Sequence, residues 1–160
     1  MQLAPIALFV YKRLWHTQQT LCSLLKNAQA KDSDLYVFSD GAKDSHSEKG
    51  VNDVRAYIKT LSGFKNIQLI ERSQNLGLAQ SIIQGVTQLV NQFGKVIVVE
   101  DDLLLSPYFL AFMNDGLREY EREEQVASIG AYVFPVKQSL PDNFFLAGAD
   151  CWGWATWKRA

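Results

Sequence analysis

Short apolar runs alternate along this chain with longer stretches in which apolar residues recur every three or four positions. The short runs do not alternate with polar residues, which is typical of strands buried on both faces. We therefore expect strands at 5–10, 35–38, 67–70, 96–99 and 126–131. The longer stretches predict helices, the first capped by Thr17 and the last by Ser106, at 17–28, 51–61, 78–93 and 106–120. Residues 42–50 are polar and predict a loop.

Alternating strands and helices predict an α/β fold with a mainly parallel sheet. A length of 160 residues suits one domain with one sizeable core, so residues 1–160 are interpreted as a single domain. In such a sheet the carboxyl ends of the strands meet at one edge, where ligands bind. Polar and charged residues follow the first four strands: Tyr11, Lys12, Arg13, Asp40, Arg72, Asn75, Glu100, Asp101 and Asp102.

Composition narrows the classes of partner. The net charge is -1, and the absence of a basic block argues against nucleic acid or an anionic membrane surface. The apolar runs are too short to span a membrane, and the first residues do not resemble a signal peptide. Cys22 and Cys151 lack metal-site spacing, and Cys22 is expected in the core. We expect a reduced, cytoplasmic protein, with peripheral membrane contact left open for the full-length chain.

The most informative segment is the acidic turn Glu100-Asp101-Asp102, directly after the strand at 96–99. Three neighbouring carboxylates repel one another unless a cation or a hydrogen-bonded ligand offsets the repulsion. Glycine-rich phosphate loops of the two common types are absent, so a diphosphate would need another counter-charge. Mg²⁺ or Mn²⁺ on Asp102, helped by Arg13 or Arg72, would supply it, because both cations prefer oxygen ligands.

Two further segments have a local and a functional interpretation. Asp40-Gly41 follows a strand, so Asp40 either bonds its own turn or accepts a hydrogen bond from a nucleobase. Asn75-Leu76-Gly77 precedes the helix at 78–93, and these residues either shape the start of that helix or favour an anionic ligand there. No Ser/His/Asp or Cys/His constellation is evident.

Taken together, these segments resemble glycosyltransferases of the GT-A fold, an α/β/α sandwich that binds a nucleotide. Asp40-Gly41-Ala42-Lys43-Asp44 resembles the Asp-Gly-Ser-x-Asp turn of the family-2 group, and Asn75-Leu76-Gly77-Leu78-Ala79 is similar to its Asn-x-Gly-Leu-Ala motif. Glu100-Asp101-Asp102 stands in the place of the Asp-x-Asp motif and is closer to the Glu-Asp-Asp of the N-acetylglucosaminyltransferase I family. The resemblance covers roughly residues 5–157.

The resemblance implies a metal-dependent enzyme that moves a sugar from a nucleotide-diphosphate sugar to an acceptor hydroxyl, on a carbohydrate or a lipid-linked molecule. It implies that Asp102 coordinates Mn²⁺ or Mg²⁺ at the diphosphate and that Asp40 binds the base. Glu100 and Asp101 would contact the base, the ribose or the transferred sugar. The remaining implied contacts to the nucleotide are Arg13, Arg72 and Asn75.

The chain also departs from this pattern. Ser39 precedes Asp40 where a second Asp is common, which makes the register imperfect. The segment 150–154 resembles one that borders the donor sugar, and the base of inverting members lies beyond it. We therefore expect a C-terminally truncated chain, inactive as it stands unless Asp150 substitutes. Alternatives are a non-catalytic nucleotide- or cation-binding module, a receiver-type signalling domain and, more closely related, a nucleotidyltransferase.

Overall fold

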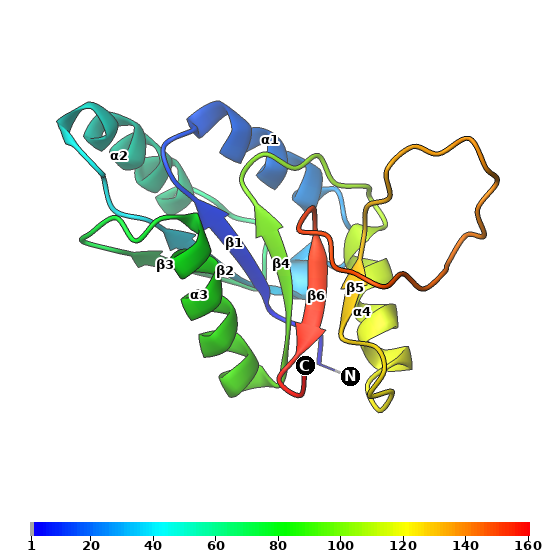
Figure 1. The fold of residues 1–160 in the computed structure, drawn as a ribbon. Coiled ribbons are helices and arrows are strands. Elements are labelled where there is room, and N and C mark those ends of the chain that lie inside the picture. Colours follow the sequence, from blue (N-terminus) through cyan, green and yellow to red (C-terminus); the bar gives the residue numbers. More distant parts are fainter. Residues whose placement is uncertain (1) are drawn as a thin grey trace.

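The computed structural model describes residues 2–160, and in that range the chain forms one six-stranded sheet in the order β3-β2-β1-β4-β6-β5 (Figure 1). The strands are β1 (Ile6–Val10), β2 (Asp34–Ser39), β3 (Asn66–Glu71), β4 (Lys95–Glu100), β5 (Ser128–Gly130) and β6 (Trp154–Trp157). The helices are α1 (Leu14–Leu25), α2 (Ser45–Lys59), α3 (Leu78–Phe93) and α4 (Phe109–Glu119), with a 3₁₀ turn, η1 (Ala30–Asp32). The first four strands are parallel, whereas β6 is antiparallel to both β4 and β5.

Both faces of the sheet are covered, which confirms the expected α/β/α sandwich. Along β1, Leu8 packs in a core with α1, α2 and α4, whereas its neighbours Ala7 and Phe9 pack in a second core with α3. All residues of β1 are buried, because successive side chains point to opposite, covered faces. Figure 1 shows α3 in front of the sheet and α1 and α2 behind it. The predicted uninterrupted apolar strands follow from this burial on both sides.

The structure corrects three predicted helix starts, those of α1, α2 and α4. α1 begins one turn earlier than expected, with Arg13 at its N-cap; Thr17 lies inside the helix and its hydroxyl donates to the Arg13 carbonyl at 3.0 Å. α2 begins at Ser45, so residues 45–50 are helical and not a loop. Asp44 caps α2 reciprocally with Ser47, and the Asp44 carboxylate accepts from the Ser47 N–H at 2.9 Å. This cap outweighs the polar composition of the first turn.

Cys22 is exposed and does not belong to the core, because the outer face of α1 turns it to solvent. α4 begins at Phe109, and Ser106 lies in the turn before it, where its carbonyl accepts from the Phe109 N–H at 3.1 Å. Phe112, expected to face inward, is 42% exposed. Each of these differences is a shift of helix boundary or helix face.

The C-terminal part was the least predictable. β5 has three residues where six were expected, and β6 was not predicted. β6 adds to β4, and Trp157 is buried, with its indole N–H donating to the Leu117 carbonyl at 3.1 Å. The segment between β5 and β6 loops away from the sheet (orange in Figure 1). Within residues 2–160, none of the helices combines the length and the apolar character that crossing a membrane requires.

Candidate functional site

The acidic turn at the end of β4 meets Arg13, which follows β1 and occupies the N-cap position of α1 without a capping hydrogen bond from its side chain. One guanidinium nitrogen of Arg13, Nη2, contacts Asp101 Oδ1 and donates to Asp102 Oδ2 at 3.0 Å. Asp101 is buried, at 4% exposure, whereas 40% of the Asp102 side chain is exposed. Since β1 and β4 are parallel neighbours, their carboxyl ends bring Arg13 to Asp101 and Asp102, which lie 88 and 89 positions further along the chain.

Electrostatics at this turn favour a further positive charge. The hydrogen bond that Arg13 donates to Asp101 raises the pKa of Arg13, and the charges of Asp101 and Asp102 raise it further against the effect of burial. Burial, followed by repulsion from Asp102 and Asp101, raises the pKa of Glu100. Within the described residues, Asp101 Oδ2 is buried without a hydrogen-bond partner. Arg13 therefore satisfies only part of the negative charge of the turn.

Asp40 follows β2 and lies at the start of α3. Its Oδ1 accepts from the Gly41 and Leu76 N–H groups at 3.0 and 2.9 Å, and its Oδ2 accepts from the Gly77 N–H at 2.9 Å. The residue is 7% exposed. The Gly41 contact is the one that the local interpretation predicts. The contacts to Leu76 and Gly77, 36 and 37 positions away, were not predicted; in them the carboxylate neutralises unpaired N–H groups before a helix. A contact between Asp40 and a nucleobase stays a prediction.

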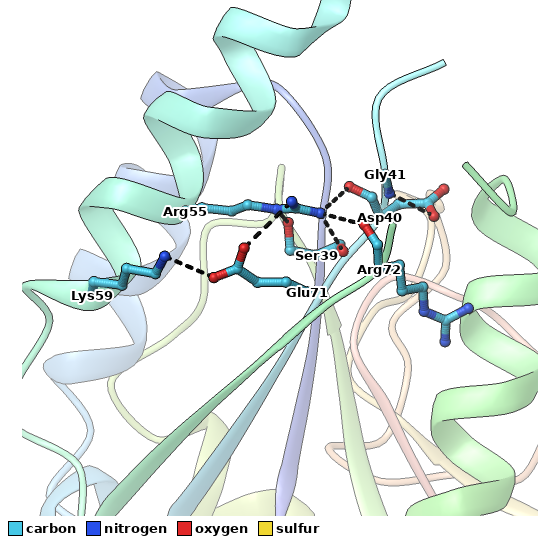
Figure 2. Close-up of polar contacts among 7 residues, drawn as sticks. All are labelled: Ser39, Asp40, Gly41, Arg55, Lys59, Glu71 and Arg72. Atoms are coloured by element: carbon cyan, nitrogen blue, oxygen red, sulfur yellow. Dashed lines mark hydrogen bonds and ion pairs between the residues drawn. The ribbon is translucent and has the colours of Figure 1, made fainter. Parts of the chain in front are cut away.

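Arg72 and Asn75 are held by hydrogen bonds to other segments of the chain. The Asn75 amide nitrogen donates to the Gly41 carbonyl at 2.8 Å, which joins the loop after β3 to the loop after β2. Arg72 Nη1 donates to Gln84 on α3 at 3.0 Å, and Figure 2 shows its side chain extending toward that helix. Both residues lie at the carboxyl edge, as expected, although neither forms a hydrogen bond with the acidic turn.

Asp150 is separate from these groups. Its carboxylate accepts from the Trp152 N–H at 2.7 Å, which is a local turn contact. The Trp152 ring lies 4.6 Å from the Tyr132 ring and 5.6 Å from the Phe134 ring, centroid to centroid, so the ends of the β5–β6 loop form a small aromatic cluster. The geometry gives Asp150 no contact with the acidic turn.

Arg55 is a further residue at this edge that was not predicted from the sequence. This α2 residue reaches the carboxyl ends of β2 and β3 and binds main-chain carbonyl groups there (Figure 2). A signal was present: Arg55 follows Val51 by four residues, so it borders the apolar stripe of α2. A charged residue at that margin needs a hydrogen-bonding partner where its charge becomes buried.

Among residues 2–160, no group of three or more His, Cys, Asp and Glu side chains is arranged to hold a metal ion. The acidic turn nevertheless fits a hard cation in its chemistry. It offers carboxylate oxygens, a half-exposed Asp102 and an unpartnered buried oxygen on Asp101. A cation here would need further oxygen ligands from a bound molecule.

The architecture is the GT-A-type fold of nucleotide-diphospho-sugar glycosyltransferases, as similarity to solved structures shows. One is the mannosyltransferase PcManGT from Pyrobaculum calidifontis in complex with GDP-Man and Mn²⁺, with a TM-score of 0.55 and 15% identity over 78% of this chain and 34% of that chain. Another is S. aureus TarS, with a TM-score of 0.54 and 17% identity over 88% of this chain and 40% of that chain.

The chain thus spans between a third and two fifths of the length of these neighbours. No protein-family model matches it, and no curated protein matches it. At such identities the likeness shows the fold, and the receiver-type alternative is not favoured.

Proposed function

We propose that this chain is the donor-binding part of a metal-dependent glycosyltransferase, with a nucleotide-diphosphate sugar as its donor. The observation that supports the proposal most directly is the acidic turn at the carboxyl edge of a GT-A sheet. There Asp101 and Asp102 share one guanidinium, and a buried oxygen of Asp101 remains without a partner among residues 2–160. The parallel sheet brings the turn to the edge where α/β folds bind ligands.

Asp102 is the proposed metal ligand. It is the more exposed member of the pair, and a Mg²⁺ or Mn²⁺ ion commonly binds one or two carboxylates together with substrate phosphates. When bound, the cation would neutralise negative charge on the leaving diphosphate. The PcManGT structure contains GDP-Man and Mn²⁺, which supports the same choice of ligand and ion for this chain.

The other residues are assigned by their positions. Arg13 balances Asp101 and Asp102 in the free protein, and its exposed guanidinium can turn to a phosphate once a cation reaches Asp102. Glu100, half-buried beside them, and the edge residues Arg72 and Asn75 are proposed to contact the nucleotide. The acceptor is a hydroxyl group, and Asp150 is the candidate within this chain for receiving its proton.

Thermal unfolding with UDP, GDP, CDP or dTDP, each with and without Mn²⁺, tests the proposal. A ligand at 100 times its Kd stabilises a protein by about 2.7 kcal/mol, which corresponds to a rise in Tm of about 5–10 °C for a domain of this size. We expect a Mn²⁺-dependent rise with at least one nucleotide. Stabilisation by Mn²⁺ alone, equal with and without every nucleotide, would reject donor binding and leave a cation-binding module.

Two variants test the ligand assignment. Asp102→Ala is expected to remove the Mn²⁺-dependent part of the shift. Asp115→Ala is the control, since Asp115 is an exposed acid on α4 that pairs with Arg118 at 2.8 Å, away from the acidic turn. An undiminished shift in Asp102→Ala would rule out Asp102 as the ligand.

A further inference from the structure

Arg55 binds the ends of two strands from the side of the sheet that α2 covers. Its Nη2 donates to the carbonyl groups of Ser39, Asp40 and Arg72, at 3.3, 3.2 and 2.7 Å (Figure 2). Its Nε donates to the hydroxyl of Ser39 at 3.0 Å. The Arg55 side chain is only 15% exposed, so these bonds are shielded from competition by water.

Few other side chains could make these contacts. The carbonyl groups come from the last residue of β2 and from the residues that follow β2 and β3, where the ladder of strand hydrogen bonds ends. Arg55 Nη2 carries two N–H donors, which the three carbonyl groups share, and Nε carries a further donor in the same fixed fork, which serves the hydroxyl. Lysine has three donors on one atom and could serve only part of this set.

The contacts of Arg55 continue into the candidate site through Asp40. Arg55 holds the Asp40 carbonyl, while the Asp40 carboxylate holds the N–H groups of Leu76 and Gly77. Arg55 also holds the Arg72 carbonyl, so the segment 72–77 is bound at one end by Arg55 and at the other by Asp40. That segment includes two of the proposed nucleotide-contacting residues.

Lys59, which pairs with the same glutamate as Arg55, offers a matched control for variants of Arg55. Arg55 Nη1 lies 3.4 Å from Glu71 Oε2, and Lys59 Nζ lies 2.8 Å from Glu71 Oε1. Figure 2 shows Lys59 on the far side of Glu71 from the strand ends. Lys59 therefore shares the acidic partner of Arg55 and the same helix without binding the three carbonyl groups.

We propose that Arg55 is a positioning residue that sets the place of Asp40 and of the segment 72–77, and through them the affinity for the donor nucleotide. It does so without touching the nucleotide. The effect on nucleotide affinity rests on the proposed function, whereas the positioning of Asp40 and of the segment 72–77 concerns the free protein alone. The two effects need separate measurements.

Hydrogen exchange in the ligand-free protein tests whether Arg55 positions Asp40 and the segment 72–77. In Arg55→Gln we expect the amides of Leu76 and Gly77 to exchange at least about tenfold faster than in the wild type, because local opening becomes easier. Amides of β1 and β4 should change little, which separates a local effect from general destabilisation. Lys59→Gln should exchange like the wild type at both amides. Equal rates in Arg55→Gln and Lys59→Gln would overturn the proposal.

The effect of Arg55 on nucleotide affinity is tested by measuring the Kd of the nucleoside diphosphate that stabilises the wild type in the presence of Mn²⁺. We expect Arg55→Gln to raise the Kd for this nucleotide about tenfold. Arg55→Lys should recover part of the lost affinity, since Lys keeps the charge and some donors. An unchanged Kd in an Arg55→Gln protein with faster Leu76 exchange would overturn the proposed effect on nucleotide affinity. If the wild type binds none of the four nucleotides, the proposed function and the proposed effect on affinity fail together. Hydrogen exchange still decides whether Arg55 positions Asp40 and the segment 72–77.

Ser39→Ala keeps the test decisive if Arg55→Gln does not fold. It removes only the hydroxyl that accepts from Nε, in a side chain that is fully buried. We expect the same changes in exchange and affinity, smaller in size. Wild-type exchange at Leu76 and Gly77 in both Ser39→Ala and Arg55→Lys would count against Arg55 as a positioning residue.

Discussion

Replacing Asp40 with Asn distinguishes the two interpretations of this carboxylate. Asp40 accepts from the N–H groups of Gly41, Leu76 and Gly77, and both of its oxygens are used. Asn keeps the shape of the side chain but replaces one oxygen with an NH₂ group. Whichever way the amide turns, one position then places a donor against a backbone donor. The free protein should therefore lose stability.

The size of the loss follows from these contacts. One N–H group left without an acceptor costs about 1–3 kcal/mol. Loss of the negative charge at the start of α3 weakens the interaction with the helix dipole by about 0.3–1 kcal/mol. The remaining bonds also weaken, because they no longer involve a charged acceptor. We expect Asp40→Asn to lower the free energy of unfolding by about 2–4 kcal/mol.

Urea unfolding of the ligand-free protein, followed by circular dichroism, measures this loss. Asp53→Asn is the control, because Asp53 forms an exposed pair with Lys49 on α2 at 2.6 Å. Such a pair contributes about 0.3–0.5 kcal/mol. If Asp40→Asn unfolds within that margin of the wild type and loses only nucleotide affinity, Asp40 acts as a base-binding group and the structural reasoning is refuted.

Two further predictions concern the same sheet edge. The raised pKa of Glu100 means that the folded protein takes up this proton more readily than the unfolded chain, so the resulting stability is present at low pH and lost as the pH rises through the folded pKa. Glu100→Gln should therefore unfold at higher urea than the wild type at pH 7, with a smaller difference at pH 4; a less stable variant at pH 7 would contradict this. In Gly41→Ala the new Cβ would lie 2.4 Å from the Gln74 carbonyl carbon, and we expect a loss of about 2–3 kcal/mol in urea unfolding. Gly130→Ala has open space around its Cβ and should stay within about 0.5 kcal/mol of the wild type; equal losses in the two variants would show that crowding is not the cause.

The regular part of the fold was predictable because the signals were local. Strands buried on both faces leave uninterrupted apolar runs, as in β1 and β4, and α3 shows a clear helical spacing of apolar residues. β6 was not predictable in this way. Its four residues become a strand only because β4 offers an open edge and Trp157 finds a buried place beside α4. The starts of α1 and α2 moved because the N-cap position, at Arg13 and Asp44, depends on backbone geometry at single residues.

The same division applies to the candidate site. The sequence alone determined that Asp40, Asp101 and Asp102 follow strands, and a parallel sheet must bring such positions to one edge. Glu100, expected to follow a strand as well, is the last residue of β4. Only the tertiary structure decided which of them meet. It placed Arg13 between Asp101 and Asp102, and it turned Asp40 toward the start of α3. It also brought Arg55 to the strand ends, because hydrogen bonds between residues distant in sequence depend on packing angles that no local pattern encodes.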